Sequence, residues 1–384
     1  MLGLGVNKLT FAERGDTFMI KKYLRKDGIV LKQVQATKIG SLREKDPEKK
    51  GRIEVLDVPE PQIKGRADVK IKVAYCSICG SDPHSIEGIF GRPAPFGMGH
   101  ELSGVVAELG PDADVTGLKV GDRVAGNFIE YCGTCYYCRT GLQQYCRSPR
   151  RRNAPGMSEY VVWHENQVYK LPDSVSLRTG CLLEPVSISV RVTDKAGIKI
   201  GDRVAIQGGG PIGLLIVQMM KKRAATSLTL IEPIADRREL GKRFGADFVI
   251  DPNTQDVVAE CEKISEGRGF DCVVEASGFI PAAKIPIQIA ANAATLMYIS
   301  MFDNTYEMPI NNFDVFHQRE LTFTCTRVAP YSFPRTVQIF PYMDLEPFTQ
   351  KSFFLDDAAE AFDCHMTGQY PKVLINCNKD LADK

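Results

Sequence analysis

Four cysteines lie close together in the segment YCGTCYYCRTGLQQYC, residues 131–146. Cys132, Cys135, Cys138 and Cys146 follow the spacing C-x2-C-x2-C-x7-C. Four thiolates can close a tetrahedral zinc site in which no position is left for water or substrate. An iron–sulfur cluster accepts the same four ligands, whereas a C-x-x-C redox pair would use only two of them. The segment therefore predicts a metal site, and a structural rather than a catalytic one if the metal is zinc.

A second group of candidate residues is spread along the chain. Its members carry thiol, hydroxyl, imidazole or carboxylate groups, and they are Cys79, Ser81, His84, His100, Glu101 and Glu184. A thiolate, an imidazole and a carboxylate from separate positions can bind a catalytic zinc ion with one position left open. Cys76 and Cys181 lie nearby in apolar runs, where a cysteine is expected to be a small core residue.

A glycine-rich loop follows the apolar run RVAIQ and opens the helix-like segment PIGLLIVQMMKKR. Its glycines are Gly208, Gly210 and Gly213, in the pattern G-x-G-x-x-G. In this context Gly208 permits the tight turn, Gly210 lets the backbone approach a pyrophosphate, and Gly213 lets the helix pack on the strand. Pro211 and Ile212 complete the loop, and the helix amino terminus favours the phosphate charge. We expect a dinucleotide site.

An acidic residue, Glu232, ends the next apolar run, nineteen residues beyond Gly213. A carboxylate at this point can accept hydrogen bonds from both ribose hydroxyls and repels a 2′-phosphate. The sequence therefore favours NAD over NADP. Arg237 and Arg238 follow closely and either could approach such a phosphate, or both could lie on a solvated helix face.

The pattern of apolar residues differs between two parts of the chain, and the two patterns together predict a mixed α/β fold. Short β-rich runs separated by Gly, Pro and Asp precede residue 187 and indicate a small antiparallel β domain. From about residue 187, β-rich runs alternate with helix-like segments, which predicts a doubly wound parallel sheet. These runs are 203–208, 228–232, 248–251, 272–277, 295–300 and 321–326. The segment DDAAEAFDCHMTG reads as a helix that returns to the first domain.

Length and composition fit a two-domain enzyme. The chain has 384 residues, 44% of them hydrophobic, and a formal charge of +1. That balance gives no reason to expect nucleic acid or an anionic membrane as a partner. The sequence carries neither an apolar run of membrane-spanning length nor the pattern of a secretory signal. We therefore expect a cytoplasmic protein with a small-molecule substrate.

The motifs CGSDPH, GHE, the four-cysteine segment, GGGPIG and EASG occur in one order over residues 34–378. In this order they resemble the zinc-dependent medium-chain alcohol and polyol dehydrogenases, and most closely the sorbitol dehydrogenase branch. The resemblance implies a GroES-like catalytic domain at 34–186 and 327–384, and a Rossmann domain at 187–326. Residues 1–33 are expected to form an N-terminal extension. It also implies a homodimer or homotetramer, often paired through a Rossmann sheet edge, for which we expect the strand around LMYISMF.

The same resemblance assigns roles to individual residues. Cys79, His100 and Glu101 match the ligands of the catalytic zinc, and Glu184 matches a carboxylate that binds this zinc or holds its water. It also favours zinc over an iron–sulfur cluster for the four-cysteine segment, which gives two zinc ions in all. Ser81 would accept the proton of the substrate hydroxyl, and His84, Glu184 or ordered water would complete the relay. Gly208, Gly210, Gly213 and the residues between them, together with Glu232 and Arg237, would bind the nicotinamide dinucleotide.

The expected reaction is hydride transfer between a secondary alcohol, such as a polyol, and NAD, which yields a ketone. A threonine dehydrogenase-like activity and the oxidation of a bulky or cyclic secondary alcohol are the alternatives within this chemistry. A non-catalytic nucleotide-binding member of the same fold is the alternative from another class. Loss of Cys79, His100 or Glu101 would have favoured it, and all three residues are present.

Overall fold

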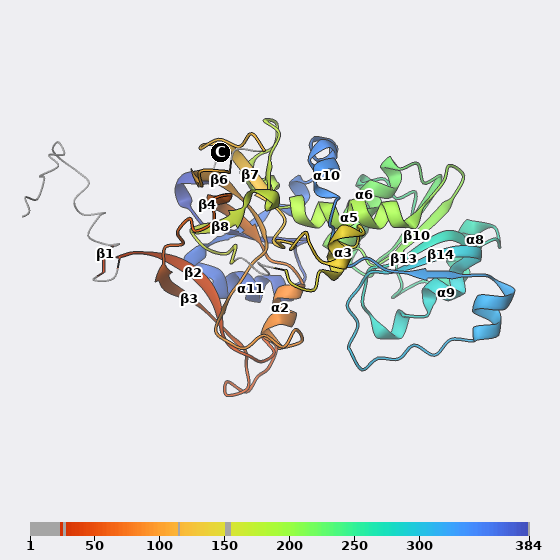
Figure 1. Cartoon of the computed structure of the whole chain (residues 1–384). Helices are drawn as coiled ribbons and strands as arrows, with labels where there is room; N and C mark the ends of the chain where they lie inside the picture. Colours follow the sequence, from red (N-terminus) through yellow and green to blue (C-terminus); the bar gives the residue numbers. More distant parts are fainter. Residues whose placement is uncertain (1–23, 26–27, 114–115, 150–154, 383–384) are drawn as a thin grey trace, which may run out of the picture.

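The computed structural model describes residues 24–25, 28–113, 116–149 and 155–382. Residues 1–23 of the predicted extension lie outside this part of the chain. Two sheet-based units lie on either side of helix α5 (Leu183–Ala196), as Figure 1 shows. Helix α5 contacts strands of the first unit and both a helix and a strand of the second. It therefore forms the structural joint between them.

The first unit contains a sheet of seven strands with the path β16-β17-β4-β6-β7-β9, to which β8 adds by pairing with β4. The strands are β4 (Asp68–Ser77), β6 (Glu101–Leu109), β7 (Arg123–Gly126), β8 (Tyr160–His164), β9 (Val168–Lys170), β16 (Lys351–Phe354) and β17 (Val373–Asn376). All pairs are antiparallel except that of β16 with β17. Strand β4 pairs with three neighbours and is almost wholly buried, which fits its apolar sequence DVKIKVAYCS.

A second, four-stranded sheet flanks the first. It consists of β1 (Leu24–Arg25), β2 (Gly28–Lys38), β3 (Arg52–Pro59) and β5 (Phe96–Gly97). Because β1 pairs with the start of β2, and β2 pairs with β3 from Val30 onward, residues 24–25 and 28–33 of the predicted extension take part in this sheet. The other domain limits predicted from the sequence stay predictions.

Short helices fill the connections of the first unit. They are α2 (Ser81–Ile86), α3 (Tyr136–Arg139), α4 (Leu177–Gly180), α10 (Phe333–Ile339) and α11 (Ala358–Thr367). Helix α11 confirms the predicted helix near the carboxyl end, and β17 after it pairs with β4, so the chain does return to the first sheet. Among the described residues, no helix combines the length and the apolarity that crossing a bilayer would require.

The second unit is a parallel sheet in the order β12-β11-β10-β13-β14-β15. Its strands confirm all six predicted runs and are β10 (Arg203–Gln207), β11 (Ser227–Ile231), β12 (Phe248–Ile250), β13 (Phe270–Glu275), β14 (Ala290–Tyr298) and β15 (Thr322–Thr324). Helices between them are α6 (Pro211–Lys222), α7 (Ala235–Arg243), α8 (Val257–Ser265) and α9 (Ile285–Ile289). The GroES-like unit and this Rossmann sheet confirm the predicted fold class.

Both faces of the parallel sheet are covered. Val204 and Ile206 of β10 belong to one apolar cluster, which includes residues of α5 and α6. Ala205 between them belongs to another, which includes residues of α8 and α9. Since successive side chains of a strand point to opposite faces, a strand buried on both sides is expected to be continuously apolar, as RVAIQ is over its three central residues.

The proposed pairing edge of this sheet needs correction. We expected the strand around LMYISMF to serve, but these residues include the end of β14, which lies between β13 and β15. A strand with two hydrogen-bonded neighbours has no free edge to offer a second subunit. The edge strands of the sheet are β12 and β15.

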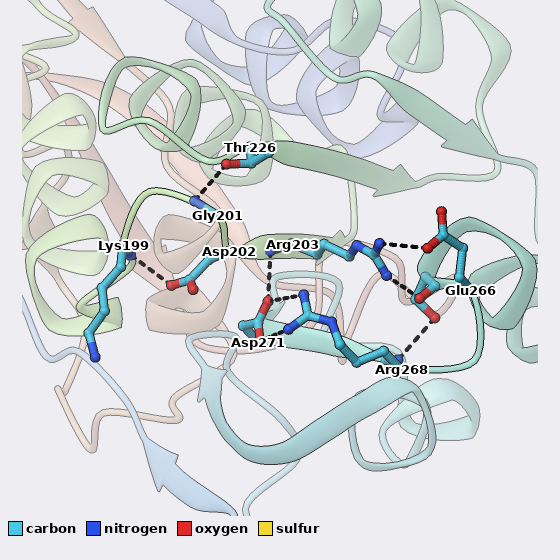
Figure 2. A network of polar contacts seen from close by, with 10 residues as sticks. Lys199, Gly201, Asp202, Arg203, Thr226, Glu266, Arg268 and Asp271 are labelled. Atoms are coloured by element: carbon cyan, nitrogen blue, oxygen red, sulfur yellow. Dashed lines mark hydrogen bonds and ion pairs between the residues drawn. The ribbon is translucent and has the colours of Figure 1, made fainter.

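A polar network anchors the amino ends of two central strands (Figure 2). The carboxylate of Asp271 accepts the backbone N–H of Arg203 at 2.8 Å and two N–H groups of the Arg268 guanidinium at 2.9 and 2.8 Å. Arg203 begins β10 and extends its own guanidinium to Glu266 at 3.2 Å. The network thus fixes β10 against β13 at the end remote from Gly208, which follows the last residue of β10.

Candidate functional site

Three of the predicted ligands come together in one cluster. One ligand atom each from Cys79, His100 and Glu101 lies within 4.8 Å of the others. The sheet explains the meeting, because Glu101 opens β6 directly opposite Ser77, the last residue of β4. Cys79 follows Ser77 by two residues and His100 precedes Glu101. A soft thiolate, an imidazole and a carboxylate form a donor set that suits zinc.

Asp82 supports two of these ligands from behind. Its carboxylate accepts the backbone N–H of Cys79 at 2.9 Å and lies 3.6 Å from Nδ1 of His100. Burial by itself would lower the pKa of His100, but Cys79 and Asp82 raise it well above its usual value. The surroundings of His100 are therefore strongly negative, which favours a bound cation.

Glu101 is held by partners that the sequence did not suggest. Nζ of Lys372 donates to both carboxylate oxygens of Glu101, at 2.7 Å to Oε1, and the hydroxyl of Ser77 donates to Oε2. The side chains of Lys372 and Glu101 are 3% and 1% exposed. A single lysine directly before the buried strand VLIN is unusual, and it was the available signal for this contact.

Glu184 lies near the cluster without joining it. It is the second residue of α5 and is buried, and its carboxylate is not among the group of ligand atoms found within the described residues. Burial raises the pKa of Glu184 to about 7, an effect that His100 opposes and Glu101 reinforces. Whether Glu184 binds the metal or its water therefore stays a prediction.

The two remaining relay residues both lie on α2. Ser81 is its first residue, two positions after Cys79, and its backbone carbonyl accepts a hydrogen bond from Ser85 at 2.9 Å. His84 is partly exposed, and its Nδ1 lies 3.4 Å from a carboxylate oxygen of Glu87. Ser81 thus lies two positions after a predicted ligand, and the proton relay itself stays a prediction.

The four cysteines of the second cluster also converge. One sulfur each from Cys132, Cys135, Cys138 and Cys146 lies within 4.8 Å of the others. The backbone N–H of Cys135 donates to the sulfur of Cys132, and that of Cys132 to the sulfur of Cys146, both at 3.4 Å. The first of these bonds contributes most to lowering the pKa of Cys132 to about 6. This arrangement fits a metal that is closed off by four thiolates.

The glycine loop has the geometry expected of a phosphate-binding turn. Gly208 has a φ of +102°, a conformation that side chains rarely allow. A Cβ atom on Gly213 would lie 1.9 Å from the carbonyl oxygen of Gly208, whereas one on Gly210 would meet nothing within 4 Å. Pro211 is the first residue of α6, where its missing N–H costs nothing. Gly213 therefore serves packing, and Gly210 leaves open space at the amino end of α6.

Glu232 and Arg237 lie near this loop and have contacts of their own. Glu232 follows β11, and its carboxylate accepts the backbone N–H groups of Gly209 at 2.6 Å and of Ile234 at 2.9 Å. Arg237 donates to the carbonyl of Gly368, the residue after α11, at 2.5 Å. The structure thus fixes the Glu232 carboxylate beside the loop and ties α7 to the first unit.

Substituting the two glycines separately should divide folding from cofactor binding. Gly213→Ala is expected to lower the free energy of unfolding by several kcal/mol, about 2 to 4, because its Cβ collides with backbone. Gly210→Ala should leave that free energy nearly unchanged and weaken NAD binding about tenfold or more, because its Cβ fills the space meant for pyrophosphate. Denaturant unfolding and NAD titration check both. Equal loss of stability in the two variants would contradict this division.

Comparisons with known proteins identify relatives of this chain. Residues 65–173 match the alcohol dehydrogenase GroES-like domain, and residues 211–340 match the zinc-binding dehydrogenase family. The chain is 33% identical to D-arabitol-phosphate dehydrogenase of Enterococcus avium, over 85% of this chain and 93% of that protein. It is also 33% identical to a sorbitol dehydrogenase of Halalkalibacterium halodurans, over 72% and 81%, and to L-threonine 3-dehydrogenase of Pyrococcus abyssi, over 83% and 93%.

Solved structures give the same picture. A zinc-binding dehydrogenase of Clostridium scindens superposes with a TM-score of 0.83 at 30% identity, covering 90% of this chain and 99% of that one. A zinc-binding dehydrogenase of Sinorhizobium meliloti, bound to NADP, gives 0.81 at 28% identity with the same coverage. The chain belongs to the zinc-dependent medium-chain alcohol and polyol dehydrogenases, oxidoreductases that act on CH–OH groups.

Proposed function

We propose that the protein oxidises a secondary alcohol, in particular a polyol or another polyhydroxylated compound, to a ketone with NAD, and that it catalyses the reverse reduction. The observation that carries the proposal is the convergence of Cys79, His100 and Glu101 in a chain that also holds the glycine loop. A metal site that polarises the hydroxyl and a nucleotide site that accepts the hydride together suit hydride transfer from an alcohol.

The residues divide the work as follows. Cys79, His100 and Glu101 would hold zinc, whose Lewis acidity lowers the pKa of a hydroxyl group that it polarises. Ser81 takes the proton of that hydroxyl and passes it to His84 or Glu184, and the alcohol carbon is left ready to give its hydride to nicotinamide. Glu184 is proposed as the end of this relay, because its burial near His100 and Glu101 raises its pKa and so favours acceptance of a proton.

NAD is the proposed cofactor. Glu232 supports this choice, because two backbone N–H groups fix its carboxylate beside the loop, where it would repel a 2′-phosphate. Arg237 would contact the adenosine end. The Sinorhizobium meliloti relative binds NADP, so the two cofactors have to be compared directly.

We also propose a second, structural zinc ion, a location in the cytoplasm and an oligomeric state. Cys132, Cys135, Cys138 and Cys146 would hold a structural zinc, for which their four clustered sulfurs are the support. A cytoplasmic homodimer or homotetramer is proposed, and an edge strand of the parallel sheet, β12 or β15, is available for pairing. Sedimentation that shows only monomers at working concentration would contradict the assembly.

The function is tested by following NADH formation with a panel of alcohols. The panel contains sorbitol, arabitol, arabitol phosphate, butanediol, L-threonine and a cyclic secondary alcohol, each with NAD and with NADP. Oxidation of a polyol with NAD as the better cofactor would support the proposal. Preference for L-threonine would support the alternative suggested by the Pyrococcus relative. Measurable NAD binding with no turnover of any alcohol would favour a non-catalytic role.

Removing the Ser81 hydroxyl tests the proton relay. Ser81→Ala is expected to lower kcat about a hundredfold or more, the usual contribution of a positioned proton acceptor. The measurement needs a substrate that shows a deuterium isotope effect on kcat, so that chemistry limits turnover. Ser85→Ala is the matched control, because this serine lies on the same short helix and its hydroxyl donates to the backbone carbonyl of Ser81. An unchanged kcat in the Ser81 variant would exclude the relay.

A further inference from the structure

The lysine beside the metal cluster has a role that depends on its charge. Lys372 has three N–H donors, and they reach Oε1 of Glu101 at 2.7 Å, Oε2 of Glu101, and the carbonyl of Ile78 at 3.1 Å. The ammonium is thus fully satisfied inside the protein and needs no solvent. Ser77 adds a further donor to Oε2.

These bonds occupy most of the Glu101 carboxylate. A carboxylate offers about four lone-pair sites, two on each oxygen. Lys372 takes one site on each oxygen, and Ser77 takes the second on Oε2. One site is left, and it belongs to Oε1. Glu101 can therefore bind a metal only through Oε1, and it does so as a carboxylate whose charge a buried cation already offsets.

The charge beside His100 is negative, whereas the charge beside Glu101 is positive. Asp82 places a negative carboxylate 3.6 Å from its Nδ1, and a carboxylate behind a metal-bound imidazole makes the imidazole a stronger donor. Lys372 places a positive charge behind Glu101 and makes it a weaker donor. The two outer charges therefore rank the ligands, with His100 strengthened and Glu101 weakened.

We propose that Lys372 is a positioning residue that holds Glu101 in the cluster as a deliberately weak ligand, and so keeps the bound metal electrophilic at the expense of affinity. The proposal rests on the metal-binding role proposed for the Cys79, His100 and Glu101 cluster. It makes a prediction that a purely structural lysine would not make, because neutralising Lys372 should tighten metal binding and slow the reaction at the same time.

The test uses the full chain, with the catalytic metal removed by a chelator and Co2+ added back in competition with a second chelator. Bands of the one-thiolate cluster are distinguishable from those of the four-cysteine site, so the two are followed separately. Lys372→Met is expected to bind Co2+ more tightly by about 10- to 100-fold, the range usual for outer partners of metal ligands. Its kcat at saturating metal should fall at least about tenfold, and Lys372→Arg should restore both values.

Lys70→Met is the matched control. Lys70 is also a buried lysine of the same unit, and it pairs with Glu60 at 2.5 Å, away from the cluster. Its loss should change neither Co2+ affinity nor kcat. If Lys372→Met does not fold, Ser77→Ala replaces it, because the loss of one donor to Glu101 should tighten Co2+ binding in the same direction to a smaller extent.

Either of two results would overturn the inference: Co2+ affinity that is unchanged or weaker in the Lys372→Met or Ser77→Ala variant, or tighter binding with an unchanged kcat. The affinity arm needs no substrate. Failure of the wild-type protein to oxidise any alcohol would therefore count against the proposed function, while the Co2+ result would still decide the role of Lys372.

Discussion

Cys79→Ala is expected to remove the metal from the catalytic cluster and to lower kcat/KM at least about a thousandfold. Polarisation of the substrate oxygen by a metal is worth several kcal/mol, and about 4 kcal/mol corresponds to a thousandfold in rate. The loss should be local, because Asp82 contacts the backbone N–H of Cys79 and His100 rather than the thiol. Metal content should fall by one equivalent, as measured on protein dialysed against metal-free buffer.

Cys364→Ala is the control for the loss of a thiol. Cys364 is likewise half-buried, and it belongs to neither cysteine cluster. This variant should keep both metal content and kcat/KM. A Cys79→Ala protein that retains full metal and full turnover would show that the ligands were assigned wrongly, and it would remove the main support for the proposed reaction.

The sequence predicted those parts of the molecule that depend on local pattern or on residue type. The centres of runs such as RVAIQ are continuously apolar, so their burial on both faces of a parallel sheet could be foreseen. Cys79, His100 and Glu101 could also be singled out, because the order of motifs in which they stand resembles a known family, although each residue taken alone is ambiguous. Cys76 and Cys181 were predicted as core residues, and both are buried.

Contacts between distant segments could not be predicted in this way. Lys372 and Glu101 are 271 positions apart, and Arg237 and Gly368 are 131 apart. Such contacts depend on the register of β17 on β4 and on the approach of α7 to the residue that follows α11, which no local pattern specifies. The choice of sheet edge failed for a related reason: an apolar run indicates a strand, but not which strands will lie on either side of it.

A substitution in the four-cysteine cluster should lower the stability of the protein rather than its catalytic activity. Cys138→Ser is expected to remove one equivalent of metal and to lower the free energy of unfolding by more than about 3 kcal/mol. A structural zinc stabilises the folded state by its binding energy, and three thiolates hold it far less well than four. Backbone N–H groups donate to the sulfurs of Cys132 and Cys146, but without metal the clustered thiolates, within 4.8 Å of one another, would still repel each other.

Activity separates this effect from damage to the active site. The four cysteines share no residue with the Cys79 cluster, so protein that is still folded should keep kcat within about threefold under conditions that preserve the fold. Cys261→Ser, which also replaces a buried thiol but lies on α8 outside both clusters, should keep its metal and lose about 1 kcal/mol of unfolding free energy.

Cobalt substitution should give the absorption of a tetrahedral all-thiolate site. A brown, iron-containing protein would instead assign an iron–sulfur cluster to these cysteines. Loss of kcat in step with loss of this metal would contradict a structural role, because a site closed by four thiolates has no position at which substrate could be activated.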